Sequence, residues 1–261
     1  MILRVLNREG EILAQAEDRE QVSLLYEASY APGDRIQLIG DESGADCWIQ
    51  LEDSMAESLV KLRDCELLWE IPFEQQRIIY SPKAFCGEKH LIRARLAEKN
   101  EVFTRRNLAL NVYDAHGEAG GFPHAVANVE TRGESVFAAQ NAIDGIYENS
   151  CHGAWPYQSW GINRDPEAKW SLQFGREVTL DELRITLRAD FPHDSWWTQG
   201  TVWFSDGSKA VLSFRKSNRP QVFHISPRTV TELTFGDLIK ADDASPFPAL
   251  TQFEAWGIPE K

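Results

Sequence analysis

The strongest constraint on how this chain can fold is an alternation of apolar and polar side chains with a period of two residues. In Leu183–Arg188, Leu, Ile and Leu occupy every second position, with Arg, Thr and Arg between them. Because successive side chains of a strand point to opposite faces of its sheet, this segment is expected to be a strand with one buried face and one solvated face. The pattern favours a β-rich protein.

Further short segments of strand character fill the chain, separated by turn sequences such as Ala31–Asp34 and Gly40–Gly44. Short strands that recur at intervals of roughly 8–12 residues are typical of a β-sandwich or a jelly roll. The segment Glu9–Glu20 also allows some helix, although Gly10 weakens that interpretation. In the first hundred residues we expect strands over 2–5, 21–26, 35–39, 48–51, 58–62, 66–71, 77–80 and 90–96.

A polar, glycine-rich segment, Asp114–Gly121, is of the kind found at domain boundaries. The sequence therefore predicts an all-β protein with an N-terminal β-sandwich over 1–100, a connecting strand and linker over 101–121, and a second jelly-roll-like β-sandwich over 122–261. Within the second sandwich we expect a short helical turn in 135–143 and strands over 170–174, 182–188, 201–205, 210–214, 221–225, 231–235 and 252–256.

The charge balance excludes several classes of partner. The 261 residues include 40 Asp and Glu against 27 Lys and Arg, a net charge of −13. An evenly acidic protein lacks the basic patch that nucleic acids and anionic membranes require, so neither is expected as a partner. The N-terminus has no signal-peptide pattern and no apolar run approaches 18 residues, which predicts a cytoplasmic protein.

Two aromatic-rich loops are the most informative functional feature. Seven of the nine Trp residues follow residue 150, and several of them lie in Asn149–Asn163 and Arg188–Trp197, which have no helical or strand period. Loops seldom carry large aromatic side chains unless those side chains pack or bind a ligand. We therefore predict that the two loops meet in space and form a binding site.

The step Asn141-Ala-Ile-Asp-Gly145, followed by a Trp-containing segment and a strand that ends in Phe174–Gly175, resembles the discoidin domain. This domain is also called the coagulation-factor C-type or galactose-binding-like domain, and the resemblance covers roughly residues 122–258. It implies a jelly-roll β-sandwich of about eight strands that binds glycans through loops at one end. Nothing specific is recognised in residues 1–100.

The resemblance also implies a structural calcium ion, because some members hold one near the Asp-Gly step and a Glu close to the C-terminus. Here those residues are Asp144 and Glu254. The chain departs from the family pattern at Ile146–Ala154, which lengthens one connection, and at the aromatic insertion Phe191–Trp197. Both departures lie in the two aromatic loops, so the identity of the ligand does not follow from the family.

Sugars have apolar C–H faces that stack on aromatic rings and hydroxyl groups that bond to charged or amide side chains. The alternative for the Trp residues is that they fill the open end of the sandwich, and of the adjacent Trp196 and Trp197 at most one is expected to face a ligand. Arg188 could equally be solvated or paired with Asp190. The predicted ligand-binding residues are His152, Trp155, Tyr157, Arg188, Asp190, His193, Asp194, Trp196 and Trp197.

The favoured function is a non-catalytic, lectin-like carbohydrate-binding protein. The sequence contains no Gly-Xaa-Ser-Xaa-Gly elbow, P-loop, dinucleotide fingerprint or His-Glu-Xaa-Xaa-His motif. Two alternatives stay open. One is a sugar-active enzyme in which Asp190, Asp194, His152 or His193 acts as acid or base. The other is an interaction scaffold whose exposed aromatic side chains form a homo-oligomer interface.

Overall fold

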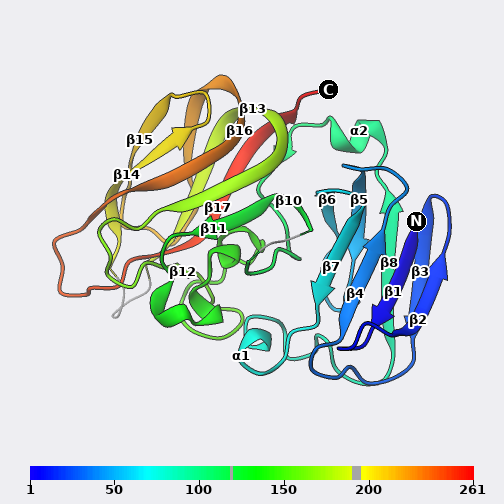
Figure 1. Ribbon diagram of the computed structural model, residues 1–261. Helices are drawn as coiled ribbons and strands as arrows, with labels where there is room; N and C mark the ends of the chain where they lie inside the picture. The colour runs from blue at the N-terminus through cyan, green and yellow to red at the C-terminus, as the bar shows by residue number, and fades with distance from the viewer. Residues whose placement is uncertain (118–119, 190–194) are drawn as a thin grey trace.

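The computed structural model describes residues 1–117, 120–189 and 195–261. Strands hold 46% of the residues and helices 7%, so the predicted all-β class is confirmed. Figure 1 shows two β-rich halves side by side, with the blue and cyan N-terminal strands in one and the yellow, orange and red C-terminal strands in the other.

The N-terminal half is a sandwich of two antiparallel sheets that share one hydrophobic core. One sheet has the order β2-β1-β4-β7 and the other the order β10-β6-β5-β8-β3. Alternation of exposed and buried residues along β3 places Val22, Leu24 and Tyr26 in this core. The strands are β1 (Ile2–Leu6), β2 (Ile12–Glu17), β3 (Gln21–Tyr26), β4 (Arg35–Ile39), β5 (Asp46–Gln50), β6 (Ser58–Leu62), β7 (Glu66–Glu70), β8 (His90–Leu96) and β10 (Gly121–Phe122).

Two of the N-terminal expectations are wrong. The segment Glu9–Glu20 contains the edge strand β2 instead of a helix. The strand expected over Arg77–Tyr80 is also missing, because helix α1 (Glu74–Arg77) ends there and Ile79 packs outside either sheet, against Val136 and Phe137 of the C-terminal half. The other helix of this half, α2 (Lys99–Val102), carries a capping box between Glu98 and Glu101.

The C-terminal half is built around two long strands that take part in both layers of the sandwich. Strand β13 pairs with β11 through its first residues and with β17 through its later residues, and its register with β16 shifts between Gln173 and Val178. The sheet order is β12-β17-β13-β16-β14-β15. The strands are β9 (Arg106–Asn107), β11 (His124–Ala127), β12 (Trp160–Gly161), β13 (Trp170–Arg188), β14 (Trp197–Phe204), β15 (Lys209–Ser213), β16 (Gln221–Lys240) and β17 (Ala249–Pro259).

Residues expected as two separate strands on either side of Gly175 therefore form the single strand β13. Gly175 has a φ of 68°, and a Cβ there would lie 2.2 Å from the ring of Phe122, so this position requires glycine. The short helix expected in 135–143 is present as a series of 3₁₀ turns. These turns are η1 (Thr131–Gly133), η2 (Ser135–Phe137) and η3 (Ala139–Ile143).

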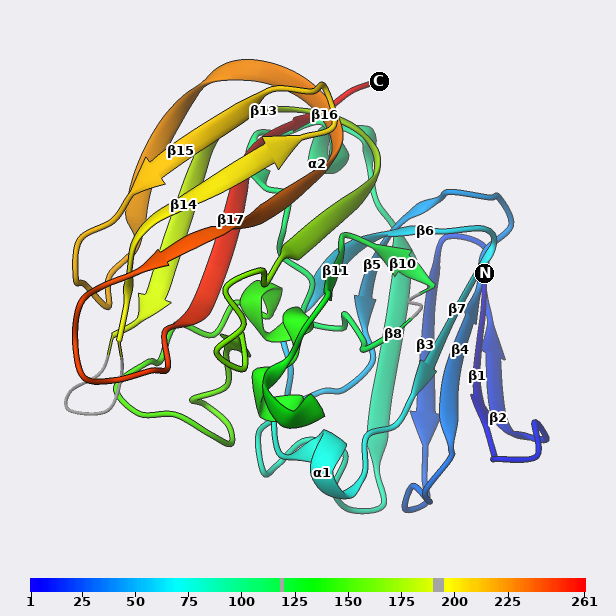
Figure 2. The same ribbon diagram turned by 60° about the vertical axis from the view of Figure 1, so that its left-hand side comes forward.

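The two halves are joined by backbone pairing as well as by side chains. Strand β10 belongs to the N-terminal sheet, whereas β9 pairs with β17, so the connecting segment is attached to both halves. Seen in Figures 1 and 2, α1 lies beside the 3₁₀ turns. Each half has its own hydrophobic cluster, which supports the predicted division into domains, although that division stays a prediction. None of the described helices is long and apolar enough to span a membrane.

Three Trp side chains lie in the core of the C-terminal half. One of them, Trp197, is a residue predicted to contact a ligand. Trp160, Trp170 and Trp197 are fully buried. The ring of Trp197 lies 6.3 Å from that of Trp160 and 6.1 Å, edge to face, from that of Phe235. Trp197 therefore packs in the core and offers no surface to a ligand in this structure.

We expect Trp197→Ala to lower the free energy of unfolding by about 3–5 kcal/mol, because it removes a fully buried indole and leaves a cavity. Urea denaturation followed by circular dichroism measures the change. The matched control is Trp155→Ala, whose side chain is 39% exposed, and we expect a much smaller loss there. Equal losses in the two variants would contradict the core assignment of Trp197.

Candidate functional site

The first aromatic loop, 149–163, contacts the end of β13, from which the second loop begins. The side-chain amide of Asn149 donates to the backbone oxygens of Leu187, at 3.0 Å, and of Asn218, at 2.9 Å. Nη1 of Arg188 lies 3.4 Å from Oγ of Ser159, which connects the end of β13 to the segment before β12. Residues 190–194 of the second loop lie outside the described residues, so the convergence of the two loops stays a prediction, and the contact shown is that of the 149–163 loop with the end of β13.

Next to the end of β13 lies a cavity of about 410 Å³, which we call the loop-end pocket. Its walls come from the 3₁₀ turns, the 149–163 loop, the end of β13 and the segment 244–249. The side chains with rings or charges that line it are Arg132, Phe137, His152, Arg164, Arg188 and Phe247. His152 and Arg188 are the predicted site residues that share this pocket.

Arg188 is the most constrained of these side chains. It is the last residue of β13, pairs with Ala249 of β17, and is only 4% exposed. Its guanidinium also lies 5.9 Å from the ring centroid of Phe137, within reach of a cation–π interaction. These contacts hold the planar guanidinium in a fixed orientation at the wall of the pocket.

Phe247 supplies the exposed ring of the pocket, and the sequence analysis did not find it. Its side chain is 40% exposed, and the guanidinium of Arg164 lies 4.6 Å from its ring centroid. The available signal was the pair of prolines, Pro246 and Pro248, which keep Phe247 out of regular structure. The segment 244–249 lies near His152 only because of the tertiary fold, so the local sequence does not predict this proximity.

The other predicted ligand residues have different positions. Trp155 is exposed but lines a separate cavity, between the two halves of the chain. Tyr157 is half-buried and does not line the loop-end pocket, and Trp196 is half-buried against the C-terminal core. Asp190, His193 and Asp194 lie outside the described residues.

The expected calcium ligands are already engaged with hydrogen-bond donors. Oδ1 of Asp144 accepts from the backbone nitrogen of Ile146 at 2.8 Å and from Nε2 of Gln252 at 2.7 Å. Its Oδ2 accepts from Nε2 of Gln158 at 2.7 Å. Calcium needs six to eight oxygen ligands, and in the described ranges 1–117, 120–189 and 195–261 no group of three or more His, Cys, Asp or Glu could hold a metal ion. Both oxygens of Asp144 thus accept hydrogen bonds, and calcium binding there stays a prediction.

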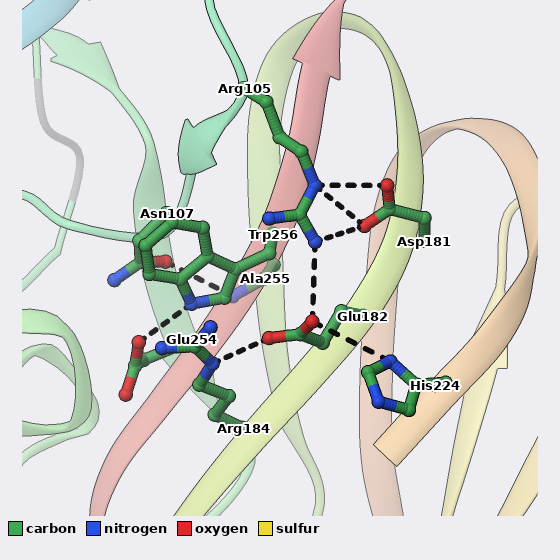
Figure 3. A network of polar contacts seen from close by, with 9 residues as sticks. All are labelled: Arg105, Asn107, Asp181, Glu182, Arg184, His224, Glu254, Ala255 and Trp256. Carbon is green, nitrogen blue, oxygen red and sulfur yellow. Dashed lines mark hydrogen bonds and ion pairs between the residues drawn. The ribbon is translucent and has the colours of Figure 1, made fainter. Parts of the chain in front are cut away.

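Glu254 belongs to a different cluster on the outer face of the sandwich (Figure 3). Its Oε2 accepts from Nε1 of Trp256 at 2.7 Å. The guanidinium of Arg184 lies 4.2 Å from the Trp256 ring centroid, and that of Arg105 lies 5.5 Å from it. Arg105 also pairs with Asp181 at 2.6 Å, so the cluster fastens the segment before β9 to the sandwich. Glu254 thus accepts a hydrogen bond within this cluster, and its role as a calcium ligand stays a prediction.

Comparison with known proteins gives only distant similarities. No protein-family model matches the chain, and no curated protein matches it. Similar solved structures include chitosan-binding module 1 of a chitosanase/glucanase from Paenibacillus sp. IK-5, with 16% identity and a TM-score of 0.37 over 58% of this chain and 99% of that one. The family 32 carbohydrate-binding module of C. perfringens NanJ, in complex with galactose, has 18% identity and a TM-score of 0.39 over 51% and 91% of the two chains.

The lectin domain of lectinolysin, complexed with Lewis B antigen, has 16% identity and a TM-score of 0.42 over 57% of this chain and 95% of that one. These modules have discoidin-like, galactose-binding-like folds, the fold to which the Asn-Ala-Ile-Asp-Gly resemblance points. Such low scores assign neither a ligand nor a site to this chain.

Asp144 gives a pH-dependent test of the site geometry. Burial raises the pKa of its carboxyl from 3.8 to about 7, against the hydrogen bonds from Ile146, Gln158 and Gln252 that favour the ionised form. The folded protein thus holds this proton more tightly than the unfolded chain does. The stability it contributes is fully present below about pH 4 and is lost as the pH rises to about 7.

We therefore expect the unfolding free energy of the wild type, relative to Asp144→Asn, to fall between pH 4 and pH 7 by up to about 1.4 kcal/mol per pKa unit. Thermal and urea denaturation across this range measures the difference. Asp181→Asn is the control of opposite sign, since the pKa of Asp181 is lowered chiefly by its hydrogen bonds with Arg105. A difference for Asp144 that stays constant or rises with pH would contradict the assignment.

Proposed function

We propose that this chain is a non-catalytic glycan-binding protein and that the loop-end pocket holds the sugar. The observation that carries the proposal is the exposed ring of Phe247 in the same pocket as the buried guanidinium of Arg188 and the imidazole of His152. An aromatic ring can stack on the C–H face of a sugar while fixed donors bond its hydroxyl oxygens. The pocket combines both requirements in one cavity.

The pocket is arranged before any ligand binds. Arg188 is fixed by the pairing of β13 with β17, and Phe247 is held between two prolines under the guanidinium of Arg164. Side chains that are already ordered lose little conformational entropy on binding, so more of the contact energy remains as affinity. This favours specific recognition of one terminal sugar unit over loose adsorption of a polymer.

The lining also favours binding over hydrolysis. Glycoside hydrolysis requires two carboxyl groups across the scissile bond. Among the described residues that line the loop-end pocket there are three Arg and one His but no Asp or Glu. The chain as a whole carries a net charge of −13, which repels polyanions, and Arg132 of the pocket is already paired with Glu134 at 2.5 Å. We therefore propose a neutral glycan as the ligand.

A glycan array followed by titration calorimetry tests this proposal. We expect Phe247→Ala to weaken binding of the best array ligand by about fivefold to tenfold, through loss of the stacking ring. Arg188→Lys should weaken it as well, because the ammonium keeps the charge but lacks the planar fork of donors.

The matched control is Tyr147→Ala, an aromatic side chain that is 41% exposed and does not line the loop-end pocket. We expect this variant to bind the same ligand as tightly as the wild type. Unchanged affinity in both Phe247→Ala and Arg188→Lys, or no binding of the wild type to any glycan on the array, would reject the loop-end pocket as the site.

A further inference from the structure

A second, larger site lies between the two halves of the chain. Two cavities there, of about 570 Å³ and about 360 Å³, share Ile79, Tyr80 and Gln140 as lining residues. We call the two together the central cleft. The loop-end pocket, by comparison, is a single cavity of about 410 Å³.

The walls of the central cleft are held together by direct contacts between the halves. The backbone nitrogen of Trp155 donates to the carbonyl oxygen of Ile78 at 2.8 Å. The hydroxyl of Ser135 donates to the carbonyl oxygen of Gln75, within α1. Ile79 packs with Val136 and Phe137 in a small hydrophobic cluster between the halves. These contacts fix the two sides of the cleft relative to each other.

The charge of the central cleft is opposite to that of the loop-end pocket. The described residues that line its two cavities include six carboxyl side chains and no Lys or Arg. Four of them already have partners among the described residues. Glu130 pairs with His116 at 3.0 Å, Asp114 with His124 at 2.7 Å and Glu134 with Arg132 at 2.5 Å, and both oxygens of Asp144 accept hydrogen bonds. Glu57 and Glu70, one in each cavity, are the two left to face a ligand. A cleft lined by one sign of charge concentrates the field and attracts ligands of the opposite sign.

The uncharged part of the lining is suited to a sugar. Trp155, 39% exposed, and Leu110 supply apolar surface in the smaller cavity, and the half-buried Tyr80 lines both cavities. Amide side chains of Gln75, Gln76 and Gln140 line the larger cavity. Aromatic faces, amides and carboxylates together match the ring faces, hydroxyls and ammonium groups of amino sugars.

We propose that the central cleft binds an amino-sugar oligosaccharide, whose protonated amines face the carboxylates while a sugar ring stacks on Trp155. A neutral oligosaccharide would leave Glu57 and Glu70 without a cation, and a simple polyamine would leave Trp155 and the amides without a matching ring or hydroxyl. This site is separate from the loop-end pocket and does not depend on the function proposed for it.

Calorimetry with a glucosamine tetramer, and with the N-acetylglucosamine tetramer as its neutral counterpart, tests the proposal on the full chain. We expect the glucosamine tetramer to bind at least tenfold more tightly, and its affinity to fall as salt rises from 50 to 500 mM because ion pairs are screened. Trp155→Ala and Glu70→Gln should each weaken it by about threefold to tenfold. Glu232→Gln, an exposed glutamate outside both cavities, should not.

The outcomes separate this proposal from the previous one. If Phe247→Ala abolishes glucosamine binding and Trp155→Ala leaves it intact, the ligand sits in the loop-end pocket and the central-cleft proposal is wrong. Tighter binding of the acetylated tetramer, no binding of either tetramer, or tighter binding of a lysine-rich peptide would overturn it too. Melting curves of each variant verify that the loss of affinity is not a loss of fold.

Discussion

The register of β13 against β16 and β17 is the constraint on which the C-terminal half depends. Leu183, Ile185 and Leu187 are fully buried, so a slip of one residue would move all of them to the other face of the sheet. The same register determines where the strand ends and therefore where the guanidinium of Arg188 is held. A feature of hydrophobic packing thus positions the most constrained donor of the loop-end pocket.

The segment 149–163 has three structural roles, which explains its unusual composition. His152 lines the loop-end pocket, Trp155 lines the central cleft, and Trp160 is buried in the core. His152 and Trp155 are three positions apart, so their Cα atoms are at most about 11 Å apart. The two candidate sites therefore lie on either side of one short loop, and a change in the backbone of this loop would affect both.

The sequence predicts the parts of the fold that local periodicity controls. Alternation identified Leu183–Arg188 and most N-terminal strands, and the Asp-Gly step with its neighbours indicated the jelly-roll sandwich. Local patterns did not identify β2, whose burial is slight, or the continuity of β13 through Gly175, which depends on close packing against Phe122. They also predicted a strand over Arg77–Tyr80. That prediction is wrong because the apolar Ile79 packs between the halves and not in a sheet.

The candidate site was harder to predict, because residue type does not reveal burial. Trp197 and Phe247 are both aromatic and both lie at the edges of loops, yet one is fully buried and the other is 40% exposed. A large indole gains more from burial than a phenyl ring, so in an aromatic-rich loop Trp is the better candidate for the core. The sequence also does not reveal the contrast in charge between the loop-end pocket and the central cleft, because each lining combines residues from distant segments. In a protein with a net charge of −13, a pocket that gathers three Arg must have been assembled by the fold, since the average composition disfavours it.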